Sequence, residues 1–463
     1  FTGPVYPVNR NAVTVAGLPA HASLADLPGP VDLAVLAVPA AAVSDTVRAC
    51  SDRGVRAVVV LTAGFADAGE RGAGAQSALV TQARAAGMRL LGPNCLGVGN
   101  TAPDVRLDAT FAPVPLPRGR VGVATQSGGL GIALLQQVQA LELGVSTFVS
   151  FGNKADVSAN DLLLWYEHDD DTDLVVLYLE SFGNPRKFAR LARRIGRHRP
   201  VVAVKGGRSE AGTRGARSHT AAAAANPAVP VDALFTQSGV VAVDTLGELC
   251  EAMALLACQP LPSGPGVAVV SNAGGPGILA ADAASAAGLT VPELGRQTQR
   301  ALRALLPTAA AVANPVGTIA SVSGADFERA IRVVLADPGV DAVLAVVTYT
   351  AVTGPDELTR AVVAAAAGTT RKPLAAAILG QPRFVAVLAD PAGKATVPAS
   401  RSPRRRRGPS PVQPSTPAGA AGRPASRPTS TGSIGYTPVA LSTTRWPLDP
   451  RGAGCPPSRR PPW

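Results

Sequence analysis

Residues 119–139, GRVGVATQSGGLGIALLQQVQ, join an apolar strand, a glycine-rich turn and an apolar helix. A related stretch, GVAVVSNAGGPGILAADAASAAG, occupies residues 266–288. The free N–H groups at the start of such a helix, together with the helix dipole, favour an anion. Each turn on its own could equally be a tight connection, but two in one chain predict two phosphate sites. Their residues are Ser127, Gly128 and Gly129, and Asn272, Gly274 and Gly275.

The chain outside these two stretches alternates between apolar runs and helical segments. Residues 31–40, 55–64 and 88–94 have the continuous apolar character of strands buried on both faces, and helical patterns separate them. This pattern predicts a parallel, doubly wound sheet in residues 1–115. Ligands bind at the carboxyl ends of the strands in such sheets, so the turns after these runs are candidate contact points.

The net charge of +11 is concentrated at the end of the chain. Residues 391–463 hold 12 Lys and Arg against one acidic residue, which leaves a neutral body with 31 residues of each sign. This Pro-, Arg- and Ser-rich tail cannot bury a core, so we expect it to be disordered. It could be a native basic arm, but an out-of-frame translation of a GC-rich gene explains its composition better. Nucleic-acid binding by the body is not expected.

The remaining composition excludes several classes of protein. The five cysteines show neither C-x-x-C spacing nor clustering with His, so no metal site and no disulfide framework is expected. No apolar run reaches the ~18 residues of a membrane span. The first residues, FTGPVYPVNR, do not resemble a signal peptide and begin as if within a domain. We therefore expect a cytoplasmic protein with no membrane contact.

Two further residues are candidates for catalysis. His219 lies in the stretch GTRGARSHTAAAAA (212–225), which we expect to be a basic loop, and imidazole can carry a phosphoryl group or a proton near neutral pH. Glu180 follows the apolar run 174–179 and could orient that imidazole. The alternatives are a solvated loop histidine and an ordinary glutamate at a strand end.

The ordered set of motifs resembles the ADP-forming acyl-CoA (acetyl-CoA) synthetases, relatives of succinyl-CoA synthetase. The resemblance covers about residues 1–385. Its segments are YPVN (6–9), VDLAVLAVPA (31–40), TAGF (62–65), GPNCLG (92–97), TQSGGLG (125–131), SFGNKADV (150–157), DLLLWYEHDDDTDLVVLYLESF (161–182), VKGGRSEAG (204–212), RSHT (217–220) and SNAGGPG (271–277). The chain is also similar to the CoA-ligase-like half of bacterial protein lysine acetyltransferases.

The resemblance implies an α/β fold in four parts. These are a truncated Rossmann-like CoA-binding domain (1–115), a succinyl-CoA-synthetase-like domain with the phosphohistidine loop (116–260), a second flavodoxin-like domain of this type (261–390) and the tail (391–463).

The resemblance also implies roles for individual residues. His219 would be phosphorylated and Glu180 would steady it, while the two helix starts would receive the phosphate. The residues implied to bind coenzyme A are Val8, Pro39, Gly64, Asn94 and Cys95. The activity implied is the interconversion of acyl-CoA, ADP and phosphate with acid, CoA and ATP through an acyl phosphate and a phosphohistidine.

The sequence departs from the family pattern in four places. It begins after the family's first strand and glycine-rich turn, AAAAANPAVP follows the SHT motif, and Asn314–Gly317 reads NPVG in place of NPVD. No nucleotide-grasping domain is visible. We therefore expect an ATP-grasp subunit or domain to supply ATP, ADP and Mg²⁺, a small carboxylic acid as substrate, and an oligomeric assembly.

Two alternatives remain for the function. The first is a CoA- or acyl-CoA-sensing module of a lysine acetyltransferase, although such a sensor needs neither His219 nor Glu180. The second is a dinucleotide-binding Rossmann protein, which is disfavoured because no Gly-x-Gly-x-x-Gly turn precedes an acidic strand end at the required spacing.

Overall fold

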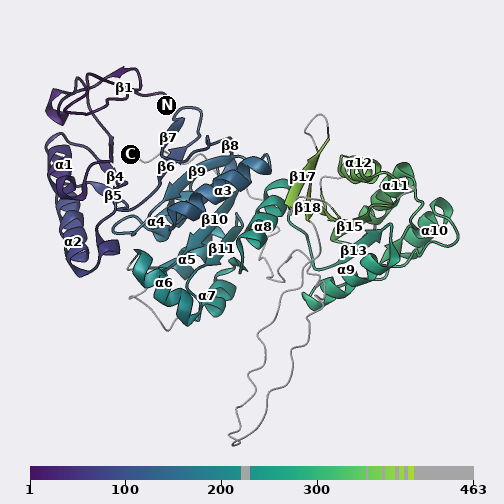
Figure 1. Ribbon diagram of the computed structural model, residues 1–463. Helices are drawn as coiled ribbons and strands as arrows, with labels where there is room; N and C mark the ends of the chain where they lie inside the picture. The colour runs from purple at the N-terminus through teal and green to yellow at the C-terminus, as the bar shows by residue number, and fades with distance from the viewer. Residues whose placement is uncertain (221–229, 351–352, 368–370, 381–384, 391–394, 401–463) are drawn as a thin grey trace, which may run out of the picture.

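A computed structural model of the chain is shown in Figure 1. It describes all residues except 221–229, 351–352, 368–370, 381–384, 391–394 and 401–463, and it leaves the side chains of residues 217–220 and 355 undescribed. The predicted tail therefore lies outside the described residues, apart from residues 395–400.

The first part of the chain is a parallel three-stranded sheet in the order β3-β4-β5, covered by α1 and α2 (purple in Figure 1). An antiparallel pair, β1 with β2, precedes it. Its elements are β1 (Thr14–Val15), β2 (Leu18–Pro19), η1 (Leu24–Asp26), β3 (Leu33–Leu36), α1 (Ala40–Asp52), β4 (Ala57–Val60), η2 (Ala66–Ala68), α2 (Glu70–Ala85) and β5 (Arg89–Leu91).

The second part is a seven-stranded sheet in the order β12-β11-β10-β8-β9-β6-β7. Its first five strands are parallel, and β6 and β7 extend it in antiparallel fashion. Its elements are β6 (Gly97–Asn100), β7 (Leu107–Thr110), β8 (Arg118–Thr125), α3 (Gly128–Ala140), β9 (Val145–Ser150), α4 (Ala159–Glu167), β10 (Leu174–Leu179), α5 (Pro185–Ile195), β11 (Val201–Lys205), α6 (Glu210–Thr220), α7 (Val231–Ser238), β12 (Val241–Val243) and α8 (Leu246–Cys258).

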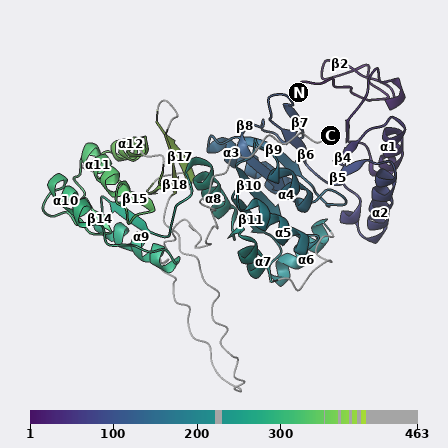
Figure 2. The same ribbon diagram turned by 180° about the vertical axis from the view of Figure 1, so that it is seen from behind.

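Alternate residues of the central strands supply two separate cores. Val175 and Leu177 of β10 pack with α4, α5 and α7 on one face. Figure 2 shows the ribbon of the molecule from the side opposite to that of Figure 1. Leu174 and Val176 pack with α3 and α8 on the other face. This period of two explains why β10 is apolar throughout, because a strand in a doubly covered sheet buries both faces.

The third part is a six-stranded sheet in the order β14-β13-β15-β16-β18-β17. Helix α8 joins it to the second part, because β17 and β18 pack against α8. Strand β18 ends at Ser400 and places Val397 and Ala399 in the core, so our expectation that the tail buries no core is wrong for residues 396–400. Its elements are β13 (Val267–Ser271), α9 (Gly274–Ala286), α10 (Arg296–Leu305), β14 (Val316–Gly317), α11 (Gly324–Leu335), β15 (Ala342–Thr348), α12 (Pro355–Ala366), β16 (Leu374–Leu379), β17 (Val385–Ala389) and β18 (Thr396–Ser400).

Candidate functional site

The first glycine-rich turn ends in an open helix start. Strand β8 stops at Thr125, and Ser127 caps α3 by accepting a hydrogen bond from the N–H of Leu130 at 3.4 Å. Gly128 and Gly129 form the first turn of α3, and no neighbouring atom lies within 4 Å of the position that a Cβ on Gly129 would take. The turn therefore has room for an anion beside its N–H groups.

Glu180 lies beside this helix start, at the carboxyl end of β10. Only 8% of its surface is exposed. Gln126, in the turn before α3, accepts hydrogen bonds on Oε1 from the backbone N–H groups of Glu180 (2.9 Å) and Ser181 (3.1 Å). Because β8 and β10 are parallel neighbours, the turn and the carboxylate are held at one edge of the sheet.

Two lysines complete this cluster, and sequence reasoning did not single them out. Lys154 follows β9, and its Nζ donates to the carbonyl oxygen of Ser181 at 2.8 Å. Lys205 ends β11, the strand on the other side of β10. We call Gln126, Lys154, Glu180 and Lys205 the Glu180 cluster. The motif SFGNKADV contained Lys154, but its burial beside Glu180 depends on the order of the strands.

Electrostatics within the Glu180 cluster alter the protonation of both lysines. The pKa of Lys154 is lowered to about 8, mainly by burial and then by the charge of Lys205, while the charge of Glu180 opposes the shift. Burial also lowers the pKa of Lys205, against the charge of Glu180, and Arg208 adds to the decrease. Two ammonium groups around one carboxylate give this edge of the sheet an affinity for anions.

His219 is the second-last residue of α6, so our expectation of a loop for residues 212–220 is wrong. The side chain of Ser209 accepts a hydrogen bond from the N–H of Gly212 (3.0 Å), and its carbonyl accepts one from Thr213 (2.8 Å). This is an N-terminal cap, and the good helix formers that follow extend the helix despite its glycines. The His219 side chain and residues 221–225 of the predicted loop lie outside the described part of the chain.

The second glycine-rich turn has the same construction. Asn272 is fully buried, and Gly274 and Gly275 begin α9 with no neighbouring atom within 4 Å of their Cβ positions. Strands β13 and β15 pair as β8 and β10 do, with Ser271 opposite Val346 and Thr125 opposite Tyr178. The internal similarity that the sequence suggested is therefore present in three dimensions.

The first sheet brings together three of the five residues implied to bind CoA. Pro39, Gly64 and Asn94 follow β3, β4 and β5, which are adjacent and parallel. The hydroxyl of Thr62 donates to the carbonyl of Val38 (2.6 Å), and the N–H of Asn94 donates to the carbonyl of Thr62 (3.0 Å). These bonds hold the three turns along one edge.

The other two predicted CoA residues lie differently. Cys95 is 3% exposed, its Sγ donates to the carbonyl of Val60 at 3.3 Å, and burial raises its pKa to about 12. A thiol in this environment is a packing group, because it stays protonated and inert near neutral pH. Val8 lies in the N-terminal segment and forms an isolated bridge with His21.

A polar contact connects the first sheet to the second. Nδ2 of Asn153, in the loop after β9, donates to Oδ1 of Asp67 at 2.8 Å and to Oε1 of Gln76 at 3.0 Å. Gly152 lets the loop after β9 approach the loop after β5 closely, since a Cβ on Gly152 would lie 2.1 Å from the carbonyl oxygen of Asn94. The predicted CoA edge is thus fixed to the loop that carries Lys154.

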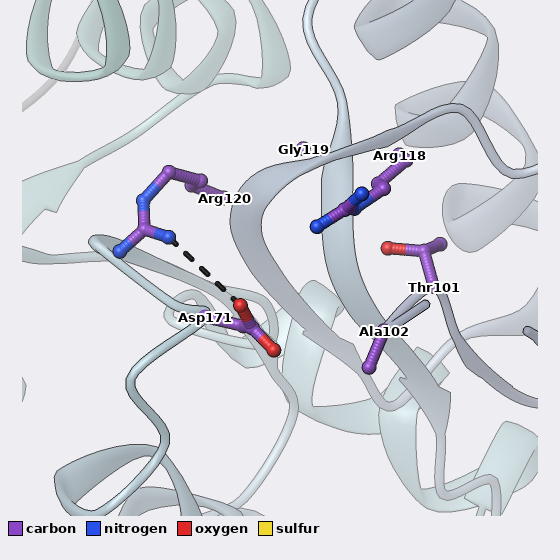
Figure 3. A pocket seen from close by; sticks show the side chains of 6 residues that line it. All are labelled: Thr101, Ala102, Arg118, Gly119, Arg120 and Asp171. Carbon is purple, nitrogen blue, oxygen red and sulfur yellow. Dashed lines mark ion pairs between the residues drawn. The ribbon is translucent and has the colours of Figure 1, made fainter. Parts of the chain in front are cut away.

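A separate pocket lies at the opposite end of β8 (Figure 3). It has a volume of about 270 Å³ and is lined by Thr101, Ala102, Arg118, Gly119, Arg120 and Asp171. Arg120 pairs with Asp171 at 4.0 Å. Because Arg118 begins β8 and Ser127 follows its end, this pocket is not part of the Glu180 cluster.

Comparison with known families identifies each part of the chain. A CoA binding domain matches residues 2–101, a succinyl-CoA ligase like flavodoxin domain matches 118–256, and a Ligase-CoA domain matches 267–388. The chain is 40% identical over 344 residues to the alpha subunit of the ADP-forming acetate–CoA ligase II of Pyrococcus furiosus, covering 74% of each protein. The chain belongs to the ADP-forming acyl-CoA synthetase family.

Two further family members extend the comparison. The chain is 37% identical over 351 residues to the ADP-forming acetate–CoA ligase I of Archaeoglobus fulgidus. This alignment covers 76% of the chain but only 50% of the Archaeoglobus protein. A solved structure, the dinucleotide forming acetyl-coenzyme A synthetase 1 of Ca. Korarchaeum cryptofilum in complex with phosphate and ADP, matches with a TM-score of 0.77 and 33% identity over 82% of each chain.

These findings confirm the fold class and the synthetase interpretation. The chain is an α/β protein built from a CoA-binding domain and succinyl-CoA-ligase-like domains, and it is a component of an NDP-forming acyl-CoA synthetase. These three relatives are ligases and synthetases, so they give no support to the acetyltransferase sensing module. No helix in the described part of the chain is long and apolar enough to cross a membrane.

Proposed function

We propose that this chain carries the CoA-binding and phosphoryl-carrying half of the synthetase reaction. The supporting observation is the open start of α3 beside Glu180, Lys154 and Lys205 at one edge of the second sheet. Helix N–H groups and ammonium groups stabilise the charge of a phosphoryl group, and Ser127, Gly128 and Gly129 would provide the nearest donors.

The proposed reaction has three balanced steps. An oxygen of inorganic phosphate attacks the thioester carbonyl, the C–S bond breaks, and CoA leaves as the acyl phosphate forms. A ring nitrogen of His219 then attacks phosphorus, and the carboxylic acid leaves as its carboxylate. The phosphoryl group passes from His219 to ADP, which gives ATP and the free imidazole. Glu180 would orient His219, and Asn272, Gly274 and Gly275 would form the second phosphate site.

We further propose that CoA binds at the edge formed by the turns of Pro39, Gly64 and Asn94. Cys95 would contribute through its backbone position, since its thiol is buried, and Val8 would reach the same ligand from the N-terminal segment. The match of residues 2–101 to a CoA binding domain supports this assignment.

A partner is expected to handle the nucleotide. One relative is named as an alpha subunit, and this chain spans only half of the Archaeoglobus relative. We propose that an ATP-grasp subunit or domain binds ATP, ADP and Mg²⁺, that the substrate is a small carboxylic acid, and that the complete enzyme is an oligomer of the two parts in the cytoplasm.

Arsenolysis of acetyl-CoA tests this proposal without the partner. Arsenate replaces phosphate in the first step, and the acyl arsenate hydrolyses in water, so free CoA accumulates and a thiol reagent detects it. We expect the full chain to release CoA and Gly129→Asp to release far less. The new carboxylate suits the helix dipole but competes with the anion.

Ala325→Asp is the matched control, because it places the same charge at the second residue of α11, a helix outside the proposed site. It should release CoA at the wild-type rate. An absence of CoA release by the wild-type chain, or an equal loss in both variants, would contradict the proposal.

A further inference from the structure

The two glycine-rich turns of this chain share a backbone construction. The hydroxyl of Thr125 donates to the carbonyl of Ser127 at 2.9 Å, and the hydroxyl of Ser271 donates to the carbonyl of Ala273 at 2.8 Å. In each turn the same hydroxyl also accepts the N–H two residues ahead, at 3.2 Å. The strand pairing therefore makes Gln126 equivalent to Asn272 and Glu180 equivalent to Thr348.

The amide side chains of Gln126 and Asn272 differ in their hydrogen bonds. Both groups of the Asn272 amide bond the backbone of Thr348: Nδ2 donates to its carbonyl at 2.8 Å, and Oδ1 accepts from its N–H at 2.8 Å. Both polar atoms of that side chain hold the end of β15, so Asn272 would contribute to the second phosphate site through its backbone.

The side chain of Gln126 is one methylene longer than that of Asn272, and it reaches two residues that follow β10, Glu180 and Ser181. Its Oε1 accepts from the N–H groups of both Glu180 and Ser181, which fixes the orientation of the amide, since two donors require the oxygen. Its Nε2 is buried and, among the described residues, has no hydrogen-bond partner, although the residue is only 1% exposed. Buried donors nearly always have a hydrogen-bond partner in folded proteins, so a bound ligand is the expected acceptor for this Nε2.

The place of this donor indicates what the ligand is. Nε2 lies about 2.3 Å from Oε1 by the covalent geometry of an amide, so it is next to the backbone of Glu180. Gln126 directly precedes Ser127, the residue that caps α3, and the residue after Glu180, Ser181, is bound by the ammonium of Lys154. The start of α3 and this ammonium favour an anion with several acceptor oxygens.

We propose that Gln126 is a further phosphoryl-binding residue, whose Nε2 donates a hydrogen bond to an oxygen of the phosphate or acyl phosphate at the start of α3. Oε1 of the same side chain holds the backbone of Glu180 in place. One amide thus sets the distance between the phosphoryl group and the carboxylate. This inference rests on the proposed function and adds to it the residue that recognises the phosphate.

Gln126→Glu tests the donor alone, because a carboxylate keeps the acceptor for Glu180 and Ser181 but cannot donate. We expect the KM for arsenate in the CoA-release assay to rise about tenfold or more, which corresponds to one hydrogen bond to a charged group. The KM for acetyl-CoA should stay close to wild type. Gln126→Met removes acceptor and donor together, and it should lower the melting temperature as well.

Gln137→Glu is the matched control for the added charge, because it makes the same amide-to-carboxylate change at an exposed position of α3 outside the proposed site. An equal rise in the KM for arsenate in both acidic variants would assign the effect to charge and overturn the inference. An unchanged KM for arsenate in Gln126→Glu, or a loss that follows the melting temperature, would also overturn it.

A second measurement separates this inference from the proposed function. Inorganic phosphate should raise the melting temperature of the wild-type chain, and Gln126→Glu should require a higher phosphate concentration for the same shift. If CoA release fails but this difference is present, the proposed function is wrong and the phosphate contact stands. If neither is present, both are wrong.

Discussion

The Nζ of Lys154 donates to the carbonyl oxygen of Ser181 at 2.8 Å, so the loop after β9 is attached to the end of β10. The carboxylate of Glu180 and the ammonium of Lys154 consequently occupy the same small, largely buried volume. Charge at this site is therefore sensitive to pH in a range close to neutrality.

Lys154 should make the stability of the chain depend on pH between about 8 and 10.5. Burial, as the largest cause, lowers its pKa in the folded chain to about 8, against 10.5 in the unfolded chain. Between these values the unfolded state binds more protons, so the free energy of unfolding should rise with pH, by at most about 1.4 kcal/mol per unit. Urea unfolding of the wild type and of Lys154→Met from pH 7 to 10 measures the difference.

Below pH 8 Lys154 is charged in the folded chain, and burying this charge lowers the free energy of unfolding of the wild type. Lys154→Met lacks this cost, so the difference in the free energy of unfolding between the variant and the wild type should shift in favour of the wild type as the pH rises. Lys187→Met, which removes a partly exposed lysine outside the Glu180 cluster, serves as the control for the loss of one positive charge. Parallel profiles for the wild type and Lys154→Met would show that Lys154 titrates normally.

Asn153 should be a stabilising link between the first and second sheets. It is 6% exposed and donates to both Asp67 and Gln76, and its hydrogen bond is among those that lower the pKa of Asp67 despite burial, which raises it. Asn153→Ala removes both bonds and the one that its Oδ1 accepts from Nδ2 of Asn94 (3.3 Å), and we expect it to lower the free energy of unfolding by about 1–3 kcal/mol.

The exposed Asn11→Ala should change that free energy by less than about 0.5 kcal/mol. Chemical denaturation of both variants gives the comparison. A loss in Asn153→Ala no larger than that of the control would show that the inter-sheet contact contributes nothing.

Cys95 should be unreactive in the native chain. Its thiol is 3% exposed, and burial raises its pKa to about 12, so neither access nor thiolate is available at pH 8. Iodoacetamide followed by peptide mass mapping should leave Cys95 unmodified until denaturant is added. Modification of Cys95 in the folded chain at a rate near that of a free thiol would contradict its burial.

The alternation of strands and helices was predictable because apolar runs and glycine-rich turns are local patterns. The stretch 119–139 predicted β8 and α3, which begin at Arg118 and Gly128. The helix α6 was missed because glycines at 212 and 215 suggested a loop, while the cap made by Ser209 and its bonds to Gly212 and Thr213 outweighed them.

The candidate site was only partly predictable for a related reason. Glycines and a strand-end glutamate stand out in a sequence, but Gln126, Lys154 and Lys205 acquire their surroundings from the parallel order β11-β10-β8-β9. A buried amide with an unused donor becomes visible only when the partners of its oxygen, Glu180 and Ser181, are in place.

The most direct test of the central claim is to locate the phosphoryl group on the chain. The full chain is incubated with acetyl-CoA and labelled phosphate, and the label is followed by its stability in acid and base and by peptide mapping. The account predicts an acid-labile, base-stable label on His219 that is absent from His219→Ala. An unlabelled wild-type chain that still binds CoA, or a label on another residue, would contradict it.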